Sequence, residues 1–195
     1  STIIGRYGNR IAKGKFTLYG EEHQLSINNG PNSLHGGPTG FHTKIWDAIQ
    51  ADSATVIFSY LSKDGEENFP GNLKVEIIYH LESESNSLVI EYRATTDKAT
   101  VVNLTSHGFF NLAGISNPTP TVLDHSITIN ADHFIPIDEV SIPTGEILKV
   151  ENTPMDFRTP HTIGERIEDK YQQLINGAGY DHCYVLKKPE AGVLT

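Results

Sequence analysis

Apolar and polar residues alternate through much of this chain, and the alternation predicts β-strands. In "TVIFSYLS" (residues 55–62), apolar residues such as Phe58 and Tyr60 recur at every second position. The segments "NLKVEIIYHL" (72–81) and "SLVIEYRAT" (87–95) repeat this period on either side of a short polar turn. Successive side chains of a strand point to opposite faces, so the period indicates strands with one buried face. The last two segments therefore predict a long antiparallel hairpin.

A shorter hairpin is predicted nearer the N-terminus, from Phe16 to Ile27, with its turn at residues 19–22. After the strand at 55–62, "KDGEENFPG" is a loop with an Asp-Gly turn signal. Three later segments are also strand-like: "VVNLT" (101–105), "HSITINA" (125–131) and "GEILKV" (145–150). Most of the chain is therefore expected to form short strands joined by turns.

One segment, "TIGERIEDKYQQLING" (162–177), has helical periodicity instead. Thr162 and Glu165 fit a capping box at its start, and Gly177 fits a C-terminal cap. Its apolar residues recur every three or four positions and would share one helix face. They are Ile163, Ile167, Tyr171 and Leu174. We expect one short helix over residues 162–176.

Many antiparallel strands with one short helix indicate a mainly β protein, and the expected fold is a large antiparallel β-sandwich. The sequence contains no internal repeat, low-complexity tract or linker. Residues 1–195 are therefore expected to belong to a single domain. The opening "STIIGRYGNR" and the close "KKPEAGVLT" each read as part of a strand. We accordingly expect both ends of the domain to be truncated.

The composition narrows the classes of partner. The 195 residues carry a formal net charge of −9, which argues against nucleic acid because phosphate binding needs a basic surface. No apolar run approaches the length that crosses a bilayer, so no membrane partner is expected. The single cysteine, Cys183, cannot form an intrachain disulfide, and the opening lacks a secretory-signal pattern. We expect a cytoplasmic protein that binds a small uncharged or cationic molecule.

Four segments carry polar residues that a plain β-sandwich does not require. They contain Asn9 with Arg10, His35, His107 and Asp181. Each has an ordinary structural explanation when taken alone: a surface turn, a loop histidine bonded to backbone, a core histidine, and a residue that ends a turn. Together they offer charged and neutral hydrogen-bonding groups, which suit a polyhydroxylated ligand such as a sugar.

Other site chemistry is not indicated. The sequence has no phosphate-binding glycine loop, no zinc-binding cysteine pair and no Gly-x-Ser-x-Gly elbow. Adjacent Asp181, His182 and Cys183 would point to alternate faces of a strand, which disfavours a metal site. We therefore expect no metal and no cofactor.

The same segments resemble the aldose 1-epimerase (galactose mutarotase) family, and the likeness extends along nearly the whole chain. It is carried by "GRYGNRIAKGKFTL", "INNGPNSLHGG", "DGEENFPGNLKVEIIYHL", "VVNLTSHGFFNLAG", "IPTGEI" and "GYDHCYVL", in this order. The resemblance implies a galactose mutarotase-like β-supersandwich with a cleft that binds a pyranose. It also implies an isomerase that interconverts the α and β anomers of aldoses such as galactose and glucose without a cofactor.

The resemblance also assigns roles to particular residues. The family's catalytic acid, in its Asn-His-x-x-Phe-Asn-Leu segment, falls on His107. An imidazole titrates near neutrality, which suits a group that must deliver a proton to the sugar ring oxygen. The substrate-binding positions fall on Asn9, Arg10, His35, Gly108, Phe109 and Asp181.

Two departures from the family pattern affect these expectations. Residues 106–110 read Ser-His-Gly-Phe-Phe where many relatives have Asn-His-Ser-Tyr-Phe, so the preferred sugar is not predicted. The family's general base is a glutamate C-terminal to its Gly-aromatic-Asp-His segment. The only later acid here, Glu190, lies in a turn unlike that segment. We expect the base to lie outside this chain, and the chain alone to be inactive.

Three alternatives stay open at this point. An enzyme of the same superfamily acting on a hexose phosphate would need additional basic residues, which a total of 15 Lys and Arg does not suggest. A non-catalytic sugar-binding module would not need the absent glutamate. A purely structural sandwich would require all four polar segments to be coincidental.

Overall fold

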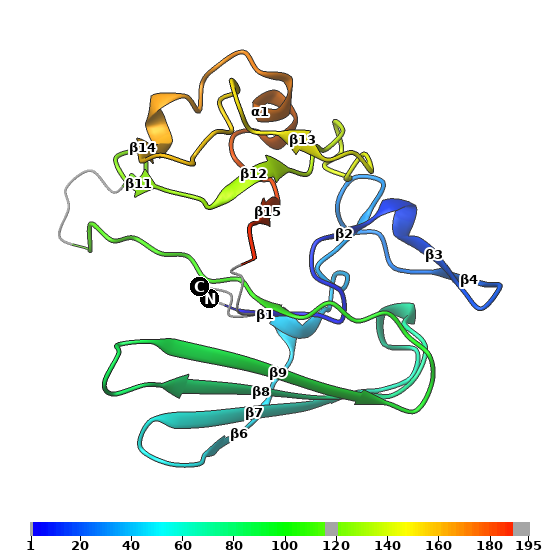
Figure 1. The fold of residues 1–195 in the computed structure, drawn as a ribbon. Helices are drawn as coiled ribbons and strands as arrows, with labels where there is room; N and C mark the ends of the chain where they lie inside the picture. Colours follow the sequence, from blue (N-terminus) through cyan, green and yellow to red (C-terminus); the bar gives the residue numbers. More distant parts are fainter. Residues whose placement is uncertain (1, 116–120, 189–195) are drawn as a thin grey trace. The chain divides into compact units, whose positions relative to one another are not determined.

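The computed structural model describes residues 2–115 and 121–188, and most of their regular structure is β-strand (Figure 1). The chain divides into two compact units, Ser1–Gly108 (unit 1) and Phe109–Thr195 (unit 2). All strand pairs among the described residues are antiparallel, apart from one isolated parallel bridge between Tyr7 and Asn103. The prediction of a mainly β, antiparallel protein is therefore confirmed.

The largest element of unit 1 is a four-stranded meander in which neighbours in sequence are neighbours in the sheet (Figure 1). Its strands are β6 (Asp47–Gln50), β7 (Thr55–Ser62), β8 (Leu73–Leu81) and β9 (Leu88–Thr96). The predicted strand at 55–62 and the predicted long hairpin are both present. The hairpin pairs in a continuous register from Leu73↔Thr96 to Leu81↔Leu88.

One face of this sheet forms the core of unit 1. Leu73, Val75 and Ile77 are at most 1% exposed and pack with Phe41. Burying an aliphatic side chain of this size contributes about 1.5–3 kcal/mol, so this row is a main source of stability. The buried core does not extend to the turn end of the hairpin, where Leu81 is 53% exposed.

Three two-stranded pairs complete unit 1. They are β1 (Ile3–Ile4) with β10 (Thr105–Ser106), β2 (Arg10–Ile11) with β5 (Ser33–Leu34), and β3 (Lys15–Leu18) with β4 (Glu21–Gln24). The β3–β4 pair is the predicted short hairpin. Its turn is tighter than predicted, with Tyr19 and Gly20 at φ values of 50° and 86°. Two left-handed residues give the strands the twist that a two-residue hairpin loop requires.

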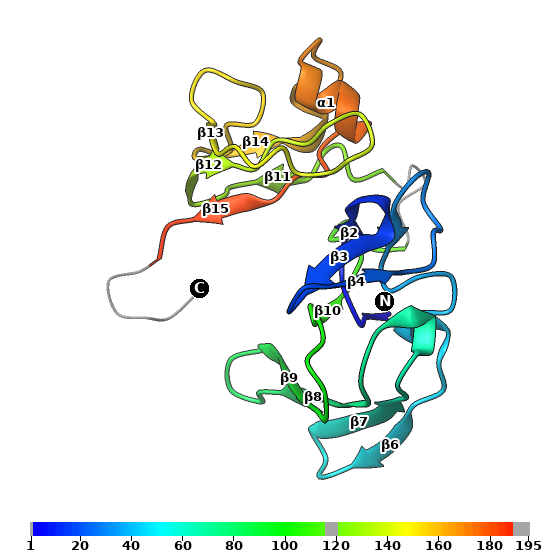
Figure 2. The same cartoon turned by 90° about the vertical axis from the view of Figure 1, so that its right-hand side faces the viewer.

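Unit 2 contains a three-stranded sheet and a separate strand pair (Figure 2). The sheet places β12 (Ala131–Phe134) between β13 (Leu148–Lys149) and β15 (Tyr184–Leu186), and β11 (Ser126–Ile127) pairs with β14 (His161–Thr162). These strands are shorter than the strand-like segments of the sequence. The unit's buried core consists of Phe134, Val150, Met155 and Leu174.

The predicted short helix is present, but it is shorter than the range 162–176 and begins later. A 3₁₀ turn occupies Ile163–Glu165, and the α-helix, α1, covers only Gln172–Gly177. Thr162 precedes the 3₁₀ turn but makes no side-chain cap bond. The left-handed residue after α1 is Ala178 (φ 50°), so the cap lies one residue beyond Gly177.

A tertiary contact explains why the helix does not extend. Arg166 has non-helical backbone angles (φ −134°, ψ 5°), and its guanidinium donates a hydrogen bond of 2.7 Å to the Asp156 carbonyl. The same group lies over the Phe157 ring, 5.2 Å from the centroid. These contacts hold the chain in a turn, and such contacts commonly outweigh intrinsic helix propensity. Among the described residues, no helix has the length and apolar character needed to cross a membrane.

Candidate functional site

Two short strands bring Asn9 and His35 together in unit 1. Asn9 immediately precedes β2, His35 immediately follows β5, and Arg10 pairs with Leu34. Asn9 and His35 then exchange two hydrogen bonds. The His35 N–H donates to the Asn9 carbonyl at 3.0 Å, and the Asn9 N–H donates to Nδ1 of His35 at 3.0 Å.

The second of these bonds fixes the tautomer of His35. A backbone N–H can only donate, so Nδ1 must accept and carries no proton. The proton of the neutral ring is therefore on Nε2. His35 is thus oriented as a donor through Nε2–H, the kind of group that can bind a sugar hydroxyl.

Both residues have unusual backbone conformations. Asn9 has φ 62° and His35 has φ 56°, which is the left-handed region. Only a few per cent of residues other than glycine adopt it, with Asn and His enriched among them. Such conformations cluster at ligand sites, where the surrounding structure holds them in place. The reciprocal hydrogen bonds supply that support here.

His107 lies at the end of β10, directly after the register pair Ile3↔Ser106. Its N–H donates to the Thr2 carbonyl at 2.9 Å. Its ring meets the His35 ring edge-on, with 5.4 Å between centroids and 82° between planes. His107 is half-buried rather than part of the hydrophobic core, so the structural explanation as a core histidine is wrong.

Arg10 is oriented by two side-chain amides. Its Nε donates to Oδ1 of Asn29 at 2.9 Å, and Nη1 donates to Oδ1 of Asn9 at 3.3 Å. Both acceptors are neutral amide oxygens. Three predicted segments, with Asn9 and Arg10, His35 and His107, therefore lie together in unit 1.

A backbone clamp joins the Asn9 segment to the His107 segment. The Gly8 N–H donates to the Asn103 carbonyl at 2.7 Å, and the Asn103 side-chain amide donates to the Gly8 carbonyl at 3.1 Å. A Cβ on Gly8 would lie 3.1 Å from the Asn103 carbonyl oxygen, closer than nearly all real contacts of this kind. Glycine therefore allows this close approach without a shift of the neighbouring atoms. Gly108, next to His107, is half-buried at the end of unit 1.

The remaining predicted residues belong to unit 2. Phe109 begins this unit and is 81% exposed. Asp181 is also exposed, and its N–H donates to Nδ1 of His182 at 3.3 Å. His182 contacts Gln173 through Nε2 at 3.1 Å, and burial lowers its pKa despite the opposing charge of Asp181. Glu190 lies outside the described residues.

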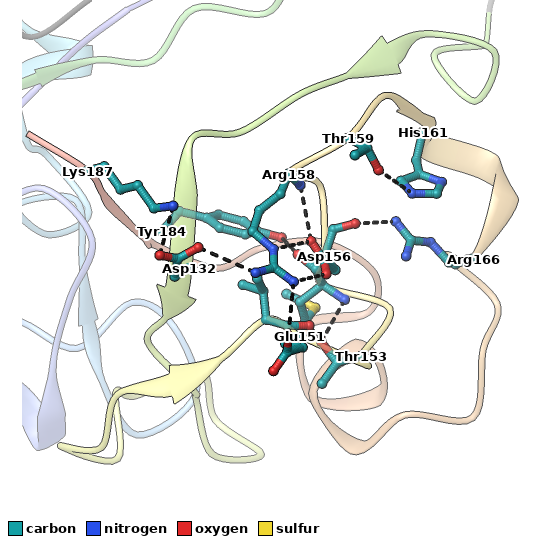
Figure 3. Close-up of polar contacts among 12 residues, drawn as sticks. Asp132, Glu151, Thr153, Asp156, Arg158, Thr159, His161, Arg166, Tyr184 and Lys187 are labelled. Atoms are coloured by element: carbon teal, nitrogen blue, oxygen red, sulfur yellow. Dashed lines mark hydrogen bonds and ion pairs between the residues drawn. The ribbon is translucent and has the colours of Figure 1, made fainter. Parts of the chain in front are cut away.

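A second polar cluster, drawn in Figure 3, lies within unit 2. Arg158 is 2.7 Å from Asp156, 3.5 Å from Asp132 and 3.9 Å from Glu151, and Lys187 is 2.8 Å from Asp132. The bonds from Lys187 and Arg158 lower the pKa of Asp132. Each of these three carboxylates lies beside Arg158 or Lys187, so the cluster is explained as a structural link between β12, β15 and the neighbouring turns. Across residues 2–115 and 121–188, no group of three His, Cys, Asp or Glu side chains could hold a metal ion.

Comparison with known proteins identifies the family. The sequence model of the aldose 1-epimerase family matches residues 1–195. The chain belongs to the aldose 1-epimerase family.

Similar members of the aldose 1-epimerase family agree with this result. The chain is 49% identical to the galactose mutarotase of Bos taurus and 45% identical to that of Homo sapiens, in each case over 95% of this chain and 51% of the relative. It superposes on the crystal structure of galactose 1-epimerase from Lactobacillus acidophilus NCFM with a TM-score of 0.86 at 32% identity, covering 97% of this chain and 56% of that one. The galactose mutarotase-like fold is therefore confirmed. The chain spans about half the length of the curated relatives that it matches.

Sequence reasoning missed two residues of this aldose 1-epimerase chain that organise the site. Asn29 orients Arg10, and Asn103 clamps the Asn9 segment. Both lie inside the quoted segments "INNGPNSLHGG" and "VVNLTSHGFFNLAG". In the sequence, each of these two residues is an asparagine in the same segment as a candidate site residue. That position does not reveal which distant residue its side chain contacts.

Proposed function

We propose that the full-length protein is an aldose 1-epimerase that interconverts the α and β anomers of hexoses such as galactose and glucose. One observation carries this proposal. His107 and His35 come from segments far apart in sequence, yet their rings lie 5.4 Å apart, with Asn9 bonded to His35. A sugar needs such a convergence of donors on its hydroxyls and ring oxygen. The names of the relatives, galactose mutarotase and aldose 1-epimerase, support the same activity.

In the proposed reaction His107 is the general acid. It gives a proton to the ring oxygen as the bond from C1 to that oxygen breaks. A base removes the proton of the C1 hydroxyl, and C1 becomes an aldehyde carbon. Rotation about the C1–C2 bond and closure on the other face give the second anomer. The two groups return to their starting protonation states after closure, so no cofactor is consumed.

The other site residues would hold the sugar. His35 donates through Nε2–H, and Arg10 offers charged donors, which make stronger hydrogen bonds than neutral ones. Asn9, Gly108, Phe109 and Asp181 complete the proposed binding set. The base in this proposal is a glutamate outside the chain, as the family resemblance implies. Fixed orientation of the sugar between acid and base is itself a large source of rate acceleration.

The test is His107→Ala in the full-length protein. We expect the accelerated mutarotation of freshly dissolved α-galactose, followed by polarimetry, to fall by roughly a hundred- to ten-thousandfold, the usual contribution of a placed acid. His161→Ala is the matched control, because His161 lies in unit 2 and pairs with Glu165 at 3.0 Å. Unchanged acceleration in His107→Ala would contradict the role of His107.

Measurements on the full-length wild-type protein distinguish the alternative functions. Sugar binding by calorimetry without accelerated mutarotation in the wild type would favour a non-catalytic binding module. Strong competition by glucose 6-phosphate would favour a hexose-phosphate enzyme. The net charge of −9 disfavours the latter, because a phosphate dianion is repelled by a negative protein.

A further inference from the structure

The loop between β7 and β8 contacts the segment that carries His35. Its 3₁₀ turn, Glu66–Asn68, includes two left-handed residues, with Glu67 at φ 49° and Asn68 at φ 67°. The Glu67 carboxylate accepts a hydrogen bond of 2.7 Å from the Thr39 N–H through Oε1. The Thr39 hydroxyl donates to the same oxygen. A strained backbone that aims one carboxylate at a neighbouring loop indicates that the contact matters.

The loop that Glu67 contacts begins at His35. Gly36 and Gly37 follow with φ values of 85° and 95°, and the Gly37 N–H donates to the Leu34 carbonyl at 3.0 Å. A Cβ on Gly37 would overlap the Glu67 carboxylate. The carboxylate therefore packs directly against the backbone of this loop, two residues from His35.

The opposite side of the loop packs against another backbone segment. A Cβ on Gly36 would overlap the Gly5 carbonyl, and the Phe41 N–H donates to that carbonyl at 3.1 Å. Residues 36–40 are thus held between the Gly5 backbone and the Glu67 carboxylate. Removing the Glu67 carboxylate would remove the contact on one side of this loop and leave the contact with the Gly5 backbone.

We propose that Glu67 is a positioning residue that fixes the loop 36–40 and, through it, the orientation of the His35 imidazole. This inference rests on the proposed function, in which His35 binds the sugar. Glu67 does not touch the sugar in this arrangement. Its effect is to keep Nδ1 of His35 on the Asn9 N–H, so that Nε2–H stays directed as a donor.

The charge of Glu67 suits this role. Burial by itself raises the pKa of Glu67, but hydrogen bonds from Thr39 and Ser26, with the charge of Lys44 nearby, lower the pKa overall. The group is therefore ionised at neutral pH and acts only as an acceptor. Hydrogen bonds to a charged acceptor are about twice as strong as neutral ones.

The first test is spectroscopic and does not depend on activity. Histidine ¹⁵N spectra of the full-length protein should show His35 as the Nε2–H tautomer in the wild type. In Glu67→Ala, we expect this signal to shift toward averaged tautomers. Glu67→Gln keeps an amide oxygen for Thr39 and should give an intermediate shift. Glu22→Ala, which removes only a surface ion pair with Lys15, should match the wild type. An unchanged His35 signal in both Glu67 variants would overturn the proposal.

The second test is kinetic. We expect Glu67→Ala to raise KM roughly three- to tenfold, the size of one weakened hydrogen bond, with kcat changed less. In a His35→Ala background, the same substitution should leave KM nearly unchanged, because the two residues act through one contact. Fully additive effects would overturn the proposal. If the wild-type protein does not accelerate mutarotation, the proposed function fails, and the spectra alone decide the role of Glu67.

Discussion

Arg6 shows how a single buried cation supports the site of unit 1. Its side chain is 2% exposed, and its guanidinium donates to the carbonyls of Ser62, Lys63 and Pro70 and to the Ser62 hydroxyl. Burial lowers the pKa of Arg6, while the nearby Glu66 carboxylate raises it. Arg6 thereby ties the β7–β8 loop to the segment that continues to Asn9.

We expect Arg6→Met to destabilise unit 1 by about 3 kcal/mol or more, because the buried Ser62 carbonyl and the part-buried carbonyls of Lys63 and Pro70 would lose their donor. Urea unfolding of the wild type and the variant measures the difference. Arg93→Met is the matched control, since Arg93 is exposed and pairs with Glu91 on the same strand. Equal stability of Arg6→Met and the wild type would contradict this account of Arg6.

The site residues show which features of the site could be predicted from the sequence and which could not. Out-of-place polar residues and the family resemblance supplied the candidates, and the roles of all of them stay predictions. The contact between His35 and His107 was not predictable from spacing, because it depends on two strand pairs, β1–β10 and β2–β5, of only two residues each. Elements this short leave almost no periodic signal.

At the scale of elements, the side-chain period predicted the long strands and the presence of one short helix, but not the length of that helix. The strands β8 and β9 largely follow a period of two, and in β8 the buried residues Leu73, Val75 and Ile77 lie on one face. The segment 162–176 also had a good period, but Arg166 makes contacts that end the helical path. Periodicity describes one element, whereas such a contact depends on a different part of the chain.

The residues on the buried face of β8 offer a direct test of where the core of unit 1 ends. We expect Ile77→Ala to lower the free energy of unfolding by about 2–5 kcal/mol, because it leaves a cavity at a fully buried position. Leu81→Ala lies on the same face of the same strand, but Leu81 is 53% exposed, so its cost should be much smaller. Equal losses in urea unfolding would contradict the view that the buried core ends before Leu81.

At the scale of the whole molecule, buried and paired titratable groups make stability depend on pH. Hydrogen bonds from cations and hydroxyls lower the pKa of Glu67 in unit 1 and of Asp156 in unit 2, and burial lowers the pKa of His182. A group whose pKa is lowered in the folded state binds protons more readily when unfolded. Its contribution to stability is therefore present above its unfolded pKa and is lost as pH falls.

The lowered pKa values of these groups predict two stages of destabilisation by acid. The free energy of unfolding should begin to fall below about pH 6.5, where an unfolded histidine gains a proton that buried His182 resists. The free energy of unfolding should fall more steeply below about pH 4.5, because carboxylates in the unfolded chain gain protons at a higher pH than the same groups in the folded protein. Urea unfolding measured from pH 8 to pH 3 checks both stages. His182→Gln should remove much of the first stage and leave the second, because glutamine can keep a hydrogen bond but cannot take up a proton. A first stage that persists in His182→Gln would assign it to another histidine.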